Sequence, residues 1–216
     1  MTKYKSNQVR EAIFWTLGAE GERAREITLR LRRLYAADRG LGWRPRSHDQ
    51  AEHHYAFFSD APPGTGADIL FTDYEAFASL AAVMLLEHGL PQVTVIRLLR
   101  RLRPQLESIH KENLAKDPDQ LFDEKALLAQ AMPGMIAFQS TEPVILAFAR
   151  LTGSSVDEED RGLSVCVDPL ELVRFMRMQP PGTGISVFDF SRLVHELANN
   201  LLHADAIKRG RRASSL

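Results

Sequence analysis

The sequence predicts an α+β protein that is mainly α-helical, and two observations support that class. Apolar residues recur at helical spacing through the N-terminal half, where glycine and proline separate the segments. After residue 120, short β-branched and aromatic runs alternate with helical segments across short connections. We therefore expect a helical N-terminal domain over residues 1–112, a small α+β domain over 113–207 and a basic tail over 208–216.

The first two expected helices are joined by a glycine turn. Helical spacing from Ser6 or Asn7 predicts a helix that stops before Gly18, and residues 18–21 read as a turn. A second, arginine-rich helix should run from Glu22 to about Asp38. This order matches the outline of a helix-turn-helix. Two amphipathic helices with a solvated arginine face would give the same pattern.

A β-hairpin and two more helices are expected next. The aromatic and β-branched runs 54–58 and 67–71 flank the glycine-rich segment 62–66, so they should pair as a hairpin. A hairpin at this place would be the wing of a winged helix. Thr72 or Asp73 should cap a third helix that ends at Gly89, and Pro91 should open a fourth.

Residues 28–46 and 71–99 carry a resemblance to the MerR family of transcriptional regulators, and the resemblance extends over roughly residues 6–110. The first segment is similar to that family's recognition helix and its exit toward the wing, and the second to its following helix pair. The resemblance implies an N-terminal winged helix-turn-helix that binds double-stranded DNA and regulates transcription. The longer first helix, the wide hairpin and the lack of a long coiled-coil helix depart from the family pattern.

Charge is distributed unevenly along the chain. The first fifty residues hold eleven Lys or Arg against six Asp or Glu, whereas the whole chain has a net charge of −1. Clustered cations neutralise DNA phosphates whatever the charge of the remaining protein, so DNA binding by the N-terminus is the leading hypothesis. The candidate DNA-binding residues are Arg23, Arg25, Arg30, Arg32, Arg33, Arg39, Arg44, Arg46, His54 and Thr65.

The C-terminal region should be a dimerisation or sensing domain that follows a linker at 107–119. We expect helices at 121–130, 169–178 and 189–203, and strands at 135–138, 143–151, 163–167 and 185–188. A homodimer is expected because two copies would double the phosphate contacts and match palindromic sites. Its pairing surfaces would be strand 144–151 and the helix around Leu193, Leu197 and Leu201. An effector, either a small molecule or a protein, would act here.

The sequence predicts no cofactor, no metal site and no catalytic activity. The single cysteine excludes an internal disulfide and a multi-thiolate zinc site. Pro-Pro-Gly-Thr-Gly occurs at 62–66 and 180–184, but neither copy continues into the Gly-Lys-Ser/Thr that a phosphate loop needs. In the ligand-rich segment 48–54, His53 and His54 should point to opposite faces of a strand. No signal-peptide core or membrane-spanning run precedes the charged helices, so a cytoplasmic protein that does not enter membranes is expected.

Two other functions remain open. The chain could be a protein-interaction adaptor that docks an acidic partner on a face formed by Arg97, Arg100 and Arg101. It could also be a small hydrolase or transferase, for which a deep polar pocket near His195 would be the supporting observation. Salt-sensitive binding to duplex DNA would distinguish the leading hypothesis from both.

Overall fold

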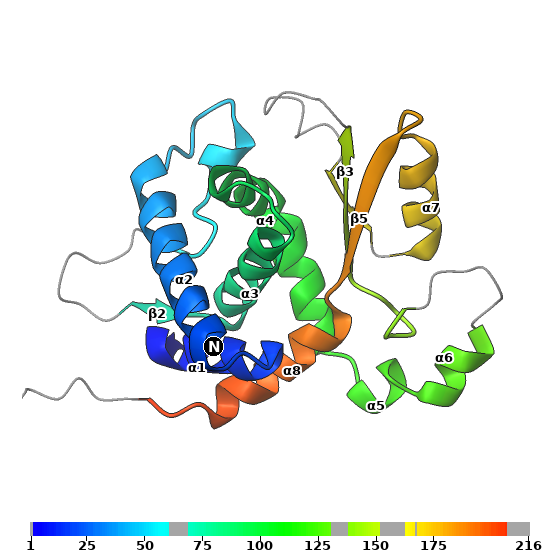
Figure 1. The fold of residues 1–216 in the computed structure, drawn as a ribbon, viewed down its shortest axis with the longest axis horizontal. Coiled ribbons are helices and arrows are strands. Elements are labelled where there is room, and N and C mark those ends of the chain that lie inside the picture. Colours follow the sequence, from blue (N-terminus) through cyan, green and yellow to red (C-terminus); the bar gives the residue numbers. More distant parts are fainter. Residues whose placement is uncertain (1, 61–68, 131–137, 152–162, 167, 207–216) are drawn as a thin grey trace, which may run out of the picture. The chain divides into compact units, whose positions relative to one another are not determined.

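The computed structural model describes residues 2–60, 69–130, 138–151, 163–166 and 168–206. Helices dominate, accompanied by two small antiparallel sheets, so the expected mainly α class of α+β protein is confirmed (Figure 1). Two compact units are present, one made of residues 1–100 and 197–216 and the other of residues 101–196. Helices α4 (Gln92–Leu114) and α8 (Ser191–His203) each contribute to both units. In the described part of the chain, no helix combines the length and apolarity that crossing a membrane requires.

Helices α1 (Ser6–Leu17) and α2 (Gly21–Leu41) form where the periodicity predicts them. Their apolar stripes are buried, with Ile13 in α1 and Ile27 in α2 fully shielded from solvent. Helix α1 ends because Gly18 adopts a left-handed conformation with φ of 56°, which glycine tolerates best. The helix, glycine turn and arginine-rich helix are therefore confirmed, and α2 extends past Asp38.

Helix α3 (Asp73–Glu87) is the buried centre of the first unit. Thr72 caps it as expected, because its hydroxyl accepts a hydrogen bond from Glu75 N–H while the Glu75 carboxylate accepts one from Thr72 N–H. Most of its side chains are buried, which explains its almost uniformly apolar sequence. The turn into α4 contains Gly89 at φ 85°, in agreement with the expected helix end.

The expected hairpin is wrong for the residues that the structure describes. Strand β2 (Leu70–Phe71) pairs with β1 (Tyr4–Lys5), which lies before α1, and residues 54–58 form no strand. The backbone N–H groups of Ala56 and Phe57 instead donate to the buried Asp38 carboxylate, at 3.0 and 3.2 Å. These donors are therefore not free for a strand partner. The side chains of Phe57 and Phe58 in this run are core residues.

The expected linker is also wrong over its first half, because α4 continues through Pro104 as far as Leu114. Pro104 removes one backbone donor from the helix. The next turns nevertheless bury Leu106 and His110, and this burial favours continuation of the helix. The short helix α5 (Pro118–Leu121) follows, capped by Asp117.

The second unit contains a three-stranded antiparallel sheet, confirming most of the expected strands. Strand β3 (Ile145–Leu151) lies between β4 (Leu163–Cys166) and β5 (Thr183–Asp189). Helix α7 (Pro169–Arg177) packs on one face, where Leu172 joins Ile145 and Ala147 in a buried cluster. Helix α6 (Glu124–Gln130) replaces the longer helix expected at 121–130. Phe138 is not in a strand, and the rest of that expected strand lies outside the described residues.

The surfaces expected to form a homodimer are buried within the protein. Strand β3 is the central strand of its sheet, and its side chains from Ile145 to Ala149 are buried. Leu197 and Leu201 on α8 are buried as well. Their apolar character therefore reflects core packing, and these side chains cannot form the exposed patch that a dimer contact needs.

The second unit also buries a histidine that should make stability depend on pH. Burial lowers the pKa of His110 to about 4, and the nearby His195 adds to the effect. Burial likewise lowers the pKa of His195, which lies with its ring Nε2 3.1 Å from the Asn113 carbonyl oxygen. Both side chains therefore favour the neutral form in the folded protein.

Stability is expected to fall as the pH drops from about 7 to about 5. An unfolded histidine gains a proton near pH 6.5, whereas folded His110 stays neutral until about pH 4, so protonation favours unfolding in this window. His110 alone should account for about 2 kcal/mol of the loss. Urea unfolding at both pH values measures this loss in the free energy of unfolding. His110→Gln should remove that share, while His48→Gln, at an exposed position, should leave the loss unchanged. An identical pH dependence in His110→Gln would contradict the assignment.

Candidate nucleic-acid interface

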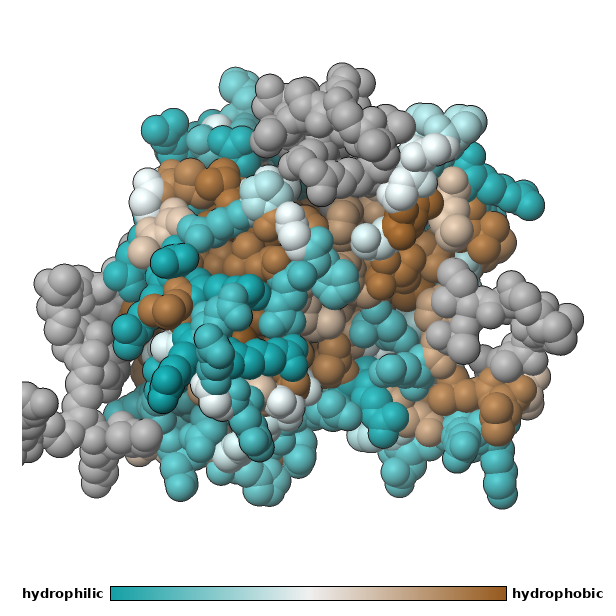
Figure 2. Space-filling view, viewed as in Figure 1, coloured by the Kyte–Doolittle hydropathy of each residue, from teal (hydrophilic) through white to brown (hydrophobic). Residues whose placement is uncertain are grey.

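Helix α2 presents a row of exposed arginines, which we call the arginine face and define as Arg25, Arg32, Arg33 and Arg39. Seven residues make almost two full helical turns, so Arg25, Arg32 and Arg39 follow one side of the helix. The buried stripe of Ile27 and Leu34 lies elsewhere on its circumference. Figure 2 shows mostly hydrophilic side chains on the visible surface over α2.

Three members of the arginine face have no internal partner. The guanidinium groups of Arg25, Arg32 and Arg33 are exposed and form no ion pair or hydrogen bond with the residues that the structure describes. The guanidinium of Arg39 lies over the Phe58 ring, 5.6 Å from its centroid, which fixes its position while leaving it exposed. The face therefore offers several cations that no carboxylate in the described part of the chain neutralises.

Arg23 and Arg30, also expected to bind DNA, instead tie α2 to α3. Arg23 Nη2 lies 3.2 Å from a Glu87 carboxylate oxygen, and Arg30 Nη1 lies 3.8 Å from the other. Arg30 also pairs with Glu26 one turn earlier on α2, at 2.5 Å. Their charge is thus partly balanced within the protein, and we leave both out of the interface.

The end of α2 is held by a buried ion pair that sequence reasoning missed. Arg100 is 1% exposed, and its Nε lies 2.6 Å from Asp38 Oδ1. The same guanidinium donates to the backbone carbonyls of Asp38, Gly42 and Ala51. Burial raises the pKa of Asp38, and Arg100 opposes that rise. Because 62 residues separate the partners, no local pattern could have indicated the pair.

The segment after α2 carries Arg44 and Arg46. Its fold is fixed by two hydrogen bonds of 2.8 Å, from Arg44 N–H to the Glu52 carbonyl and from Trp43 Nε1 to the His53 carbonyl. The 3₁₀ helix η1 (Gln50–Glu52) lies within this segment. The segment also contains a shallow hollow of about 500 Å³, which is lined by Arg44, Pro45, Arg46, Ser47, His48 and Glu52.

The two arginines of this hollow are not equivalent. The Arg44 side chain is 74% exposed and lies 3.8 Å from the Glu52 carboxylate. Arg46 is exposed and unpaired among the described residues. His54 is exposed, with its ring 6.5 Å from that of His53. Thr65, the last candidate, lies outside the described residues.

The potential metal ligands of residues 48–54 do not converge. Among the described residues, no three His, Cys, Asp or Glu side chains lie together in a group that could hold a metal ion. The expectation that His53 and His54 alternate along a strand is wrong, because no strand forms there. The His53 ring instead lies 2.6 Å from the Ser47 carbonyl oxygen, within the segment that follows α2.

The structure also bears on the face expected for an adaptor. Arg97 is exposed, but Arg100 is buried in its pair with Asp38. The expected face of Arg97, Arg100 and Arg101 is therefore not formed as proposed. No protein-family model matches this chain, and comparisons with curated proteins and with solved structures gave no match.

Proposed function

We propose that this protein binds double-stranded DNA through the arginine face of α2, with α1 and α2 acting as a helix-turn-helix. The observation that carries the proposal is the set of three exposed guanidinium groups, Arg25, Arg32 and Arg33, which have no partner in the described part of the chain. Retaining unpaired cations together on one helix is typical of surfaces that meet phosphate. The opposite stripe of α2 anchors the helix in the first unit.

The chemistry of the face suits contacts to both phosphate and bases. Arginine forms bidentate hydrogen bonds to phosphate oxygens and to guanine O6 and N7. Leu29 is 51% exposed beside the arginines and could contact a thymine methyl group. Arg46 would add a phosphate contact next to the end of α2. The hairpin wing has no part in this proposal.

The wider role within the proposal is transcription regulation by a homodimer. It draws on the MerR-like pattern, in which an arginine-rich helix is followed by a helix pair. Here α3 and α4 supply such a pair, joined at Gly89. A dimer would have to use surfaces other than β3 and the buried leucines of α8.

Binding should weaken steeply as salt rises. With three to five phosphate contacts, the logarithm of the association constant should fall against the logarithm of salt concentration with a slope of about −2.7 to −4.5. Fluorescence anisotropy of the full chain on a short random-sequence duplex, between about 50 and about 200 mM salt, measures this slope. The stoichiometry in the same titration gives the number of copies per duplex, for which two is the expected value.

An acidic peptide separates this function from the adaptor alternative. The same titration with labelled poly-glutamate, which carries charge without the geometry of a duplex, should give much weaker binding at matched salt. Equal or tighter binding to poly-glutamate would favour a protein partner. No measurable duplex binding at the lowest salt would overturn the proposal.

A further inference from the structure

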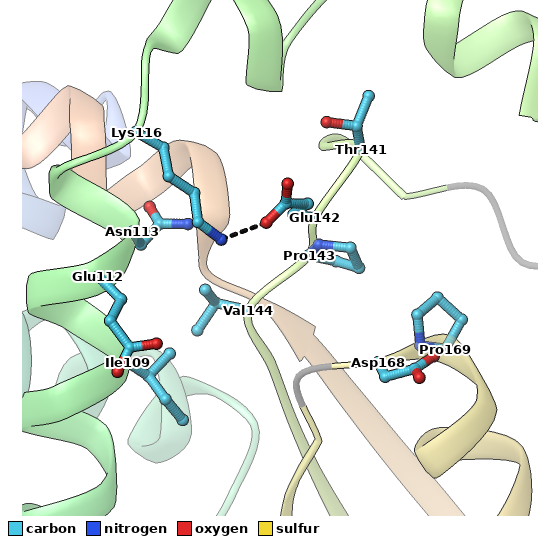
Figure 3. Close-up of a pocket in the computed structure, with 10 residues that line it drawn as sticks. All are labelled: Ile109, Glu112, Asn113, Lys116, Thr141, Glu142, Pro143, Val144, Asp168 and Pro169. Carbon is cyan, nitrogen blue, oxygen red and sulfur yellow. Dashed lines mark hydrogen bonds and ion pairs between the residues drawn. The ribbon is translucent and has the colours of Figure 1, made fainter.

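A hollow in the second unit contains a buried side chain without hydrogen-bond partners. It has a volume of about 450 Å³ and is half enclosed, between the end of α4, the segment entering β3 and the start of α7 (Figure 3). The volume lies in the range of small-molecule sites. All its lining residues belong to the second unit, so its geometry does not depend on the DNA-binding surface.

Asn113 gives this hollow its chemistry. The residue is 1% exposed, yet neither its side-chain oxygen nor its side-chain nitrogen has a hydrogen-bond partner among the residues that the structure describes. Buried amides are satisfied in almost all proteins because leaving them unpaired is costly. In Figure 3 the Asn113 amide is drawn among the residues that line the hollow. A side-chain amide can accept up to two hydrogen bonds through its oxygen and donate two through its nitrogen.

The other polar groups of the hollow restrict the charge of a ligand. Lys116 forms an ion pair with Glu142, so these two charges largely offset each other. The carboxylates of Glu112 and Asp168 remain, and they accept hydrogen bonds from Ser108 Oγ and from Leu170 N–H. The net charge of the lining is therefore negative, which disfavours an anion.

Apolar walls and a fixed backbone complete the site. Ile109, Pro143, Val144 and Pro169 line it together with the polar groups. Both backbone polar groups of Val144 are hydrogen-bonded. Its N–H donates to Ser191 Oγ and its carbonyl accepts from Phe190 N–H, each at 2.8 Å. The wall next to Asn113 is thus largely pre-formed, as small-molecule sites usually are.

We propose that this hollow binds a small neutral or cationic molecule that presents a hydrogen-bond donor beside an acceptor, as a carboxamide or a nucleobase edge does. Such an edge pairs with both orphan atoms of Asn113, while its hydrophobic remainder contacts the apolar walls. Phosphates and carboxylates are disfavoured by the negative net charge of the lining. The site would provide the effector-binding role that a regulator needs, and it stands even if the protein does not bind DNA.

Three small aromatic probes test this class of ligand on the full chain. Benzamide has the donor and acceptor, acetophenone of similar shape has only the acceptor, and benzoate is the corresponding anion. In ¹⁵N-resolved NMR titrations, benzamide should shift the side-chain amide signal of Asn113 and the backbone signal of Val144. Acetophenone and benzoate should bind about tenfold more weakly. Equal binding of all three, or no binding of benzamide, would overturn the proposal.

Asn113→Leu keeps the size of the side chain and removes its polar atoms. Benzamide affinity should fall about tenfold or more, while the thermal unfolding midpoint stays the same or rises, since no orphan amide remains. Asn199→Leu, at an exposed position on α8, serves as the control and should retain benzamide binding. A lower thermal unfolding midpoint in Asn113→Leu would show that the amide already has hydrogen-bond partners within the protein. Unchanged benzamide binding would place the ligand elsewhere. Either result refutes the site.

Discussion

Replacing Arg100 by methionine is expected to lower the free energy of unfolding by about 3–5 kcal/mol. The substitution leaves the Asp38 carboxylate buried without its cation, although that carboxylate still accepts hydrogen bonds from Ala56 and Phe57. It also deprives the Gly42 and Ala51 carbonyls of a donor. Urea unfolding at neutral pH, followed by circular dichroism, measures the loss.

The matched control lies one turn away on the same helix. Arg97 is exposed and has no partner among the described residues, so Arg97→Met should change stability by less than about 0.5 kcal/mol. Combining Asp38→Asn with Arg100→Met should recover part of the loss, because no unpaired charge stays buried. A loss below about 1 kcal/mol in Arg100→Met would mean that the buried pair does not hold the end of α2 to α4.

Local patterns were enough to predict most of the helices. Apolar spacing located α1 and α2, and Thr72 and Asp73, as the candidate caps, located the start of α3. These features act between residues a few positions apart, so they are visible in sequence. Strands β3 and β5 were likewise evident from their apolar runs.

Long-range pairing was not predictable in the same way. Tyr4 pairs with Phe71 across α1, α2 and the segment that follows them, and nothing local indicates that partner. The run 54–58 has strong β propensity, but packing of its phenylalanine side chains in the core takes the place of strand pairing. The Tyr35 ring lies 5.4 Å from that of Phe57 and 5.2 Å from that of Phe71. Pro104 suggested a helix end, but burial of the following turns outweighed the missing donor.

The sequence indicated which group of residues forms the candidate site, but not which of their side chains have partners within the protein. Charge counting picked out the arginines of α2 as a group, and the structure places Arg25, Arg32 and Arg33 at exposed positions. It could not separate Arg25 and Arg32, which are free of partners in the described structure, from Arg23, which pairs with Glu87 on α3. The adaptor hypothesis placed Arg100 on an exposed face with Arg97 and Arg101, because its partner Asp38 is distant in sequence. Asn113 gave no signal in the sequence, since only the fold shows that its amide is buried and unpaired.

The second large effect is expected from removing the free arginines of α2 together. A variant with Arg25→Ala, Arg32→Ala and Arg33→Ala should bind duplex DNA about a hundredfold more weakly at matched salt. The slope of its salt dependence should be smaller by about 2 to 3, because three phosphate or base contacts are lost. The fold should persist, since all three side chains are exposed.

The control must remove the same charge from elsewhere on the protein. Arg97, Arg174 and Arg177 are exposed and lie on α4 and α7, so replacing all three by alanine changes the net charge equally.

Anisotropy titrations of the parent and both variants on one duplex, over one salt series, test the DNA-binding proposal most directly. The α2 variant should lose affinity and salt dependence while the control variant keeps both. Parent-like binding by the α2 variant, or an equal loss in both variants, would contradict recognition of DNA by the arginine face.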